Sequence, residues 1–282
     1  MQPKSHYEGI EMKKEMLVDD TQVYIEGTGQ DTIIMLHGWP DTHELWQHQI
    51  DCFKDNYVCV SFTLPGFAKD YRNNYSVNDV VENIKHIVDA VSPNEQVILL
   101  VHDWGCVFGY EFAMRNSKRV KKMIGLDVGD INSKDLYEAL SISQKLMVFA
   151  YQIILAISFV LPRAIGNPIA RFVAKFLRAK SNMENVHAGM SMPYAMRWFG
   201  VNGGMKDLKP MDPSFPFYYA YAEKKPMMFH SPQWLLRLLE NPNNKVQAFH
   251  CGHWIMIDRT EAFNNSALEW LKPVGIRDDK IG

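Results

Sequence analysis

Apolar runs alternate with amphipathic stretches through the first half of the chain. In one of these stretches, residues 77–91, valine and isoleucine recur at the three- and four-residue spacing of an amphipathic helix, with Ser76 suited to the N-cap. Alternation of strands and helices predicts an α/β fold with a mostly parallel sheet flanked by crossover helices. Four apolar runs have the length and composition of buried strands: Thr32–Gly38, Tyr57–Leu64, Gln96–His102 and Val120–Asp127.

The pattern is different before and after these strands. Residues 16–31 are typical of a hairpin that leads into the sheet, with its turn near Asp19 and Asp20. From about Ile131 to Met205 the pattern is largely helical, and strand-like runs return only at residues 217–222 and 245–250. This predicts a core domain formed by residues 1–130 and 206–282, with a helical cap (lid) inserted at 131–205.

The most apolar stretch of the predicted cap is Leu146–Leu161. It is shorter than the about 20 residues that a membrane span needs, and it carries Gln152 and Ser158. We therefore expect a buried or cavity-lining helix. The following stretch Ala170–Lys180 is basic and amphipathic, which indicates a hydrophobic substrate or weak contact with a membrane surface.

Charge and composition narrow the choice of partners and compartment. The formal net charge is -2, from 30 Lys and Arg against 32 Asp and Glu. Without a basic patch interleaved with aromatic residues, the chain is not expected to bind nucleic acid. The 4 cysteines are scattered, and the N-terminal residues 1–16 lack the apolar region of a signal peptide, so we expect a cytoplasmic protein.

An aspartate stands where a predicted buried strand meets a predicted helix, in "LLVHDWGCVFG". Strand, then x-Asp103-x-Gly, then helix is the arrangement of a nucleophile elbow, in which a sharp turn lifts one side chain out of the sheet. Asp is also a favoured helix N-cap, so this motif alone leaves both interpretations open. Two other strands end in notable motifs, "MLHGWPD" at residues 35–41 and "HCGHWIMID" at residues 250–258.

With these motifs the chain resembles the α/β-hydrolase superfamily, and within it the branch with an aspartate nucleophile, the epoxide hydrolases and haloalkane dehalogenases. The resemblance covers about Val18 to Leu271. It rests on order: an oxyanion loop at Gly38–Pro40, the elbow at Asp103, a helical cap, and a late Gly-His pair with His253.

The resemblance implies a two-step reaction without metal or cofactor. A carboxylate such as Asp103 is already ionised at pH 7 and can attack a saturated carbon, which leaves an ester on the enzyme. His253 then activates a water that attacks the ester, while the backbone N–H groups of Trp39 and Trp104 hold the oxyanion. The counterparts of His37 and His102 support the scaffold.

The third member of the triad departs from the usual family pattern. Where many relatives have an aspartate after the seventh strand, this chain has Lys225. Some haloalkane dehalogenases carry the acid after the sixth strand, and Asp127 matches that alternative. We therefore expect Asp127 to be the acid, with Glu223 and Asp130 as rival candidates.

The cap residues decide which reaction the resemblance implies. Tyr151 and Tyr194 match the pair of tyrosines that assist ring opening in epoxide hydrolases, so we favour hydrolysis of a small hydrophobic epoxide to a vicinal diol. The alternative is a haloalkane dehalogenase acting on a halogenated substrate, with Trp104 and Trp198 at the substrate. A third alternative is a ligand-binding protein whose catalytic site is vestigial, since a fold does not fix a function.

Overall fold

The computed structural model describes residues 13–68 and 75–272. Most of the stretch used to assess a signal peptide, residues 1–12, therefore lies outside the described residues. One sheet runs through the described part in the order β1-β2-β4-β3-β5-β6-β7-β8. The strands are β1 (Lys14–Val18), β2 (Thr21–Glu26), β3 (Asp31–Leu36), β4 (Tyr57–Phe62), β5 (Val97–His102), β6 (Val120–Leu126), β7 (Phe217–Ala222) and β8 (Lys245–Phe249).

The strand pairing confirms the expected α/β fold. β1 and β2 form the predicted antiparallel hairpin, and Asp19 and Asp20 at its turn have the positive φ angles of 47° and 63°. β2 is also antiparallel to β4, whereas the pairs from β4 through β3, β5, β6, β7 and β8 are parallel. The carboxyl ends of the parallel strands therefore meet at one edge of the sheet.

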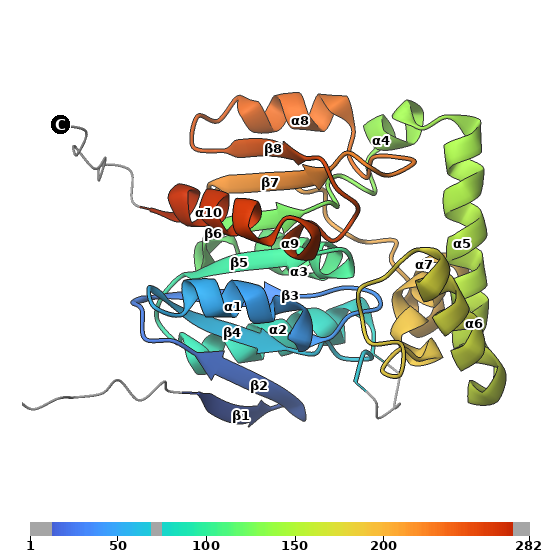
Figure 1. Cartoon of the computed structure of the whole chain (residues 1–282), viewed down its shortest axis with the longest axis horizontal. Coiled ribbons are helices and arrows are strands. Elements are labelled where there is room, and N and C mark those ends of the chain that lie inside the picture. Colours follow the sequence, from blue (N-terminus) through green and yellow to red (C-terminus); the bar gives the residue numbers. More distant parts are fainter. Residues whose placement is uncertain (1–12, 69–74, 273–282) are drawn as a thin grey trace, which may run out of the picture.

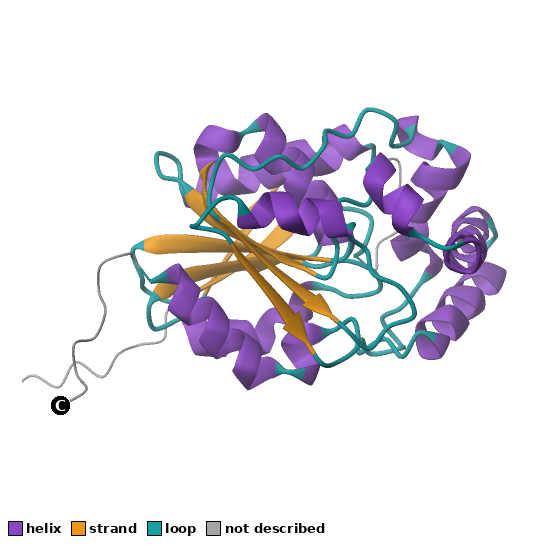
Figure 2. Ribbon diagram, turned by 90° about the horizontal axis from the view of Figure 1, so that it is seen from above, coloured by secondary structure: helices purple, strands orange, loops and turns teal. Residues whose placement is uncertain are grey.

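Helices cover both faces of the sheet (Figure 2). Along β5, Leu99 and Val101 pack into one apolar cluster, and Ile98 and Leu100 pack into the other. The central strand is thus buried on both faces, as its continuous apolar sequence predicts. The first cluster includes residues of α2 (Val77–Val91), α3 (Trp104–Arg115) and α8 (Pro232–Leu239), and the second includes those of α1 (Gln47–Phe53), α9 (Ile255–Asp258) and α10 (Thr260–Leu271).

Helix α2 shows how local sequence fixes an element boundary. The Ser76 side chain accepts a hydrogen bond from the Asp79 amide, and the Asp79 carboxylate accepts one from the Ser76 amide. This capping box satisfies backbone donors that the first turn leaves without partners. The predicted start of the helix is confirmed.

A helical layer lies beyond the carboxyl ends of the strands (Figure 1). It contains α4 (Lys134–Ala139), α5 (Ile142–Val160), α6 (Arg163–Phe176) and α7 (Met192–Phe199), as the helical pattern after Ile131 predicts. Short 3-10 helices are η1 (His43–Trp46), η2 (Ser117–Arg119), η3 (Ala188–Ser191) and η4 (Val201–Gly203).

The expectation of a buried or cavity-lining helix at Leu146–Leu161 is confirmed for the inner side of α5, where Tyr151 and Gln152 line a pocket, but its outer side is exposed. Leu155 and Ala156 on its inner side are fully buried, but Leu146 is 62% exposed and Val160 is 55% exposed on its outer side. The sequence is apolar on both sides, so its composition does not reveal that only one side meets the protein. α5 is also the one helix in the described residues that is long and apolar enough to cross a membrane.

Candidate active site

Asp103 occupies a sharp turn between β5 and α3, with a φ angle of 52°. The turn requires two glycines because other backbone passes very close to it. A Cβ atom on Gly105 would lie 2.2 Å from the Leu36 carbonyl oxygen, and one on Gly38 would lie 2.4 Å from the Asp103 carboxylate. Small residues at both positions therefore allow the elbow and the loop after β3 to touch.

The Asp103 side chain does not cap the helix that follows it, although the residue stands at the N-cap position. Its Oδ2 atom instead accepts a hydrogen bond of 2.7 Å from the Trp39 backbone N–H. The Trp104 backbone N–H favours the charged form of the same carboxylate. Both expected amide donors are therefore gathered around Asp103, and the N-cap interpretation of this residue does not hold.

His253 lies on the loop between β8 and α9 and bridges two carboxylates. Its Nε2 atom is 3.5 Å from Oδ1 of Asp103. Its Nδ1 atom lies 2.5 Å from Oδ2 of Asp127, where it donates a hydrogen bond. One imidazole therefore connects residues from the ends of β5 and β6, as a base oriented by an acid requires.

Asp127 follows β6 and is fully buried. Its Oδ1 atom accepts a hydrogen bond of 2.7 Å from the Ala222 backbone N–H and pairs with the Lys225 ammonium. Lys225, at the position where many relatives have the acid, thus forms an ion pair with Asp127. Every oxygen of this buried carboxylate has a partner, so its ionised form is stabilised.

The two rival carboxylates lie elsewhere. Glu223 is exposed, and its closest basic partner is His250, at 3.6 Å. Asp130 accepts a hydrogen bond of 2.7 Å from the Ser231 amide and further ones from the hydroxyls of Ser231 and Ser133. Neither is placed against His253.

These contacts favour the charged form of all three groups. Burial alone would raise the pKa of Asp103, but the hydrogen bond and charge of His253 hold it below its usual value. Burial opposes ionisation of Asp127 too, and there the Lys225 charge, followed by His253, lowers the pKa. Burial would lower the pKa of His253, yet its bonds to both carboxylates raise it to about 9.

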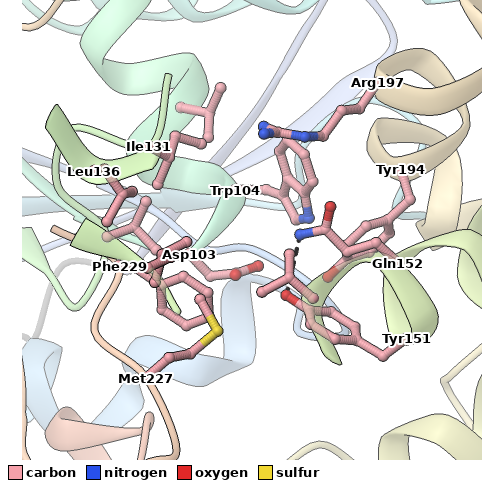
Figure 3. Close-up of a pocket in the computed structure, with 14 residues that line it drawn as sticks. Asp103, Trp104, Ile131, Leu136, Tyr151, Gln152, Tyr194, Arg197, Met227 and Phe229 are labelled. Atoms are coloured by element: carbon pink, nitrogen blue, oxygen red, sulfur yellow. Dashed lines mark hydrogen bonds between the residues drawn. The ribbon is translucent and has the colours of Figure 1, made fainter. Parts of the chain in front are cut away.

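A pocket opens above Asp103 and contains about 580 Å³ of space, counting the part open to solvent. Tyr151 from α5 and Tyr194 from α7 face Asp103 across it (Figure 3). The rest of the lining is mostly apolar, which suits a hydrophobic substrate. It consists of Trp104, Val107, Val128, Ile131, Leu136, Leu140, Val148, Gln152, Arg197, Met227 and Phe229.

Both tyrosines are protonated and close enough to feel the charge on Asp103. Burial, with the Asp103 charge contributing, raises the pKa of Tyr151 to about 12 and that of Tyr194 well above its usual value. The Tyr151 hydroxyl accepts a hydrogen bond of 3.1 Å from the Gln152 side chain. Its own proton therefore remains available to a substrate oxygen.

Trp198, expected at the substrate, does not line this pocket. Its indole N–H donates to the Gln152 side-chain oxygen over 3.0 Å, and Gln152 in turn donates to Tyr151. Trp198 therefore reaches the site only through Gln152, while Trp104 lines the pocket as expected. Trp198 is kept from the pocket because α5 turns Gln152 inward, between the indole of Trp198 and the phenol of Tyr151.

His37 and His102 take the supporting positions expected of them. His37 is buried, and its Nε2 accepts a hydrogen bond of 2.9 Å from the Leu64 amide. The His102 ring packs against His253 at an angle of 42°, with 4.4 Å between the ring centroids. Burial lowers their pKa values to about 4 and about 3, so both rings are neutral at pH 7.

The sequence did not predict that three further polar residues belong to the site. Gln152 and Arg197 line the pocket, and Lys225 pairs with Asp127. The Tyr-Gln pair on α5 was visible in the sequence, but nothing in it shows which way the amide points. Within residues 13–68 and 75–272, no group of three His, Cys, Asp or Glu side chains is placed to hold a metal ion.

The sequence profile that describes the alpha/beta hydrolase fold matches residues 31–196, more than half of the chain. Among curated proteins, cis-3-alkyl-4-alkyloxetan-2-one decarboxylase of Shewanella oneidensis is 25% identical over 39% of this chain and 36% of its own length. Epoxide hydrolase 4 of Homo sapiens is 29% identical over 34% of this chain and 27% of its own length. The matched segment thus spans only about a third of these curated relatives.

Solved structures cover nearly the whole chain. The epoxide hydrolase of Bacillus megaterium in complex with an inhibitor superimposes with a TM-score of 0.69 at 20% identity, covering 92% of this chain and 99% of that one. A loop variant of the haloalkane dehalogenase DbeA of Bradyrhizobium elkanii gives 0.64 at 15% identity, over 92% and 96%. At these identities the likeness is one of fold.

Proposed function

The chain belongs to the alpha/beta hydrolase fold family, and from this premise we propose that it hydrolyses an epoxide to a vicinal diol through an ester on Asp103. One observation carries the proposal: two protonated tyrosines from the helical layer face the carboxylate of Asp103 across one apolar pocket. A carboxylate attacks a strained ring carbon, and a phenol donates to the oxygen that leaves it. A carboxylate and a phenol facing each other suit an epoxide, because the carbon under attack and the oxygen that takes the proton belong to the same small ring.

The first step is alkylation of Asp103. Its Oδ2 is held by the Trp39 amide, so Oδ1 is the oxygen free to attack an epoxide carbon. The carbon–oxygen bond of the ring breaks, and the leaving oxygen takes a proton from Tyr151 or Tyr194. The product is an ester whose carbonyl oxygen, formerly Oδ2, remains against the Trp39 and Trp104 amides.

The second step is hydrolysis of that ester. His253 takes a proton from water, and the resulting hydroxide adds to the carbonyl carbon of the Asp103 ester. The oxyanion forms on the oxygen already held by the amides, which stabilise it as the intermediate collapses. As the intermediate collapses, the proton of the added hydroxyl passes to the departing alkoxide, so the diol leaves and Asp103 is restored as a carboxylate. The proton on His253 returns to the tyrosinate. Epoxide plus water becomes diol.

The helical layer is the cap in this proposal. Residues 131–205 supply Tyr151 and Tyr194, and a core of residues 1–130 and 206–282 supplies the triad. The division rests on the position of α4 to α7 beyond the carboxyl ends of the strands. The free thiols of the 4 cysteines support a reducing compartment such as the cytoplasm.

A haloalkane dehalogenase reaction is the second candidate. It is favoured by the acid at the end of β6 and by Trp104, which lines the pocket beside Asp103. Halide binding would draw on a second donor as well, and the indole N–H of Trp198 already donates to Gln152. The epoxide reaction uses both tyrosines as they stand, so we rank it first.

A substrate panel tests the proposal. Purified protein is incubated with terminal and internal alkyl epoxides and with 1-chloro- and 1-bromoalkanes of matched length, and diol and halide are quantified. We expect diol formation that disappears in Asp103→Asn. Halide release without diol formation would replace the proposal by the dehalogenase reaction, and neither product from any substrate would favour a vestigial site.

A further inference from the structure

Most of the large apolar side chains that the described residues expose lie on α5 and α6. Phe172 is 70% exposed and Phe176 is 73% exposed, and a contiguous exposed apolar patch typically marks an interaction site. We call this set the outer face. It consists of Ile142, Leu146, Met147, Phe149, Ile154, Ile157, Val160, Ile165, Phe172 and Phe176.

The outer face is one continuous side of two neighbouring helices. Its members recur at helical spacing, for example Ile142, Leu146 and Phe149 on α5. The opposite sides of the helices are buried, with Leu155 on α5 and Val173 on α6. Figure 1 shows both helices at the end of the molecule opposite α10, so the outer face is not shielded by the sheet.

Charge on this part of the chain has one sign. Between Ala139 and Met183 there is no Asp or Glu, although the whole chain has a net charge of -2. Lys175 and Arg178 form no ion pair within the described residues, and both are exposed. The basic residues of this segment are Lys145, Arg163, Arg171, Lys175, Arg178 and Lys180.

We propose that the outer face docks the protein on the surface of an anionic phospholipid bilayer, with α5 and α6 lying in the plane of the interface. In this orientation the apolar side chains of the outer face enter the boundary between headgroups and acyl chains, and the adjacent Lys and Arg side chains contact the lipid phosphates. Charge complementarity decides the occupant. A second copy of the chain would bring Lys175 and Arg178 of both copies together, whereas an anionic lipid surface neutralises them.

The inner contacts of α5 exclude that it spans the bilayer in this structure. Ser158 is buried and donates to the Leu155 carbonyl and to Ser191. Tyr151 and Gln152 face the pocket. A helix crossing the membrane would have to leave Ser191 and the pocket, so α5 lies on the membrane with one side and lines the pocket with the other.

Vesicle flotation tests the docking without any turnover, so its failure is distinct from failure of the proposed reaction. The full chain is floated with vesicles of phosphatidylcholine alone or with phosphatidylserine added. We expect binding to the anionic vesicles. Lys175→Glu/Arg178→Glu should weaken it at least about 30-fold, since each cation near such a surface contributes about 1 kcal/mol and each glutamate adds repulsion. Phe172→Ser/Phe176→Ser should weaken binding at least about tenfold.

Matched controls lie outside the outer face. Leu236→Ser/Leu239→Ser changes two exposed leucines on α8, and Lys14→Glu/Lys118→Glu makes the same charge change elsewhere. Both should bind as the unchanged protein does, with circular dichroism confirming that every variant is folded.

Three outcomes would overturn the proposal. The first is equal binding by outer-face and control variants, or none by the unchanged protein. The second is self-association in sedimentation that Phe172→Ser/Phe176→Ser abolishes, because the face would then cover a second copy. The third is resistance of bound protein to extraction at alkaline pH, because that would show a spanning helix.

Discussion

The carboxyl edge of the sheet and the helical layer above it hold their functional groups in different ways. At the sheet edge, Asp103, Asp127 and His253 come from three separate strand ends and are tied by ionic hydrogen bonds. In the helical layer, Tyr151 and Tyr194 stand on α5 and α7 among apolar neighbours, with 6.3 Å between their ring centroids. The sheet edge holds the charged groups in place, and the helical layer shapes the pocket above them.

This difference predicts which changes stop the reaction and which redirect it. A buried charge that loses its partner cannot be solvated, so substitutions at the sheet edge should cost orders of magnitude in rate. A helix held by apolar packing can present different side chains without losing its place. Variants of the two regions should therefore separate by the step they affect: ester hydrolysis for the sheet edge acid, alkylation for the tyrosines.

The largest effect is expected for Asp127→Asn. An amide cannot stabilise the imidazolium of His253 or fix its tautomer, and the loss of this partner in comparable triads costs on the order of 10⁴ in rate. Turnover should fall by that factor at the ester, with alkylation of Asp103 nearly intact. Glu223→Gln is the control and should retain most activity; the reverse ranking would move the acid to the loop after β7.

Tyr151→Phe and Tyr194→Phe should each slow alkylation by about 10²-fold, since a lost donor to a developing oxyanion typically has this cost or more. Hydrolysis of the ester should change much less. Rapid-quench kinetics with an epoxide separate the two steps, and Tyr137→Phe, which is 65% exposed on α4, serves as the control. Unchanged alkylation in both pocket variants would remove the tyrosines from the mechanism.

The charge on His253 should respond to the state of Asp103. Its pKa is raised to about 9 by two carboxylates, so the ring is an imidazolium at pH 7 in the resting protein. Esterification removes the Asp103 charge, which lowers the pKa of His253 and favours the neutral base needed next. Asp103→Asn mimics this loss, and we expect histidine NMR titration to show a pKa below 9. An unchanged value would mean that Asp103 and His253 are not electrostatically coupled.

The smallest effect concerns stability rather than rate. Lys225 pairs with Asp127 in the interior, and its side chain is 8% exposed. Lys225→Met leaves the buried Asp127 carboxylate with His253 but without the Lys225 cation at its other oxygen, and we expect the free energy of unfolding to fall by about 3 kcal/mol. Lys121→Met breaks the exposed pair with Asp31 and should cost under about 1 kcal/mol. Urea denaturation of the two variants compares them directly.

The sheet and its motifs were predictable because local signals agree with the fold. Apolar runs gave the six predicted strands after the hairpin, and the capping residues gave the start of α2. The association of Asp103 with His253 also follows, because parallel strands bring their carboxyl ends to one edge. Asp127 was favoured over Glu223 and Asp130 by the family resemblance alone, since nothing else in the sequence shows which carboxylate points at the histidine.

The helical layer was less predictable because apolar composition does not distinguish an inner side from an outer one. Both sides of α5 are apolar, so the exposure of Leu146 could not be foreseen. The interposition of Gln152 between Trp198 and Tyr151 depends on helix rotation, which a short pattern does not specify. The errors thus fall in the region where packing, rather than strand geometry, places the side chains.

The measurement that tests the central claim most directly is intact-protein mass spectrometry of His253→Gln after incubation with an epoxide that the unchanged protein turns over. Attack by Asp103 does not need the histidine, whereas hydrolysis of the ester does, so we predict an adduct of one substrate mass. Peptide mapping should place it on Asp103, and Asp103→Asn/His253→Gln should show none. An unmodified His253→Gln protein, or an adduct on another residue, would contradict the assignment of Asp103 as the nucleophile.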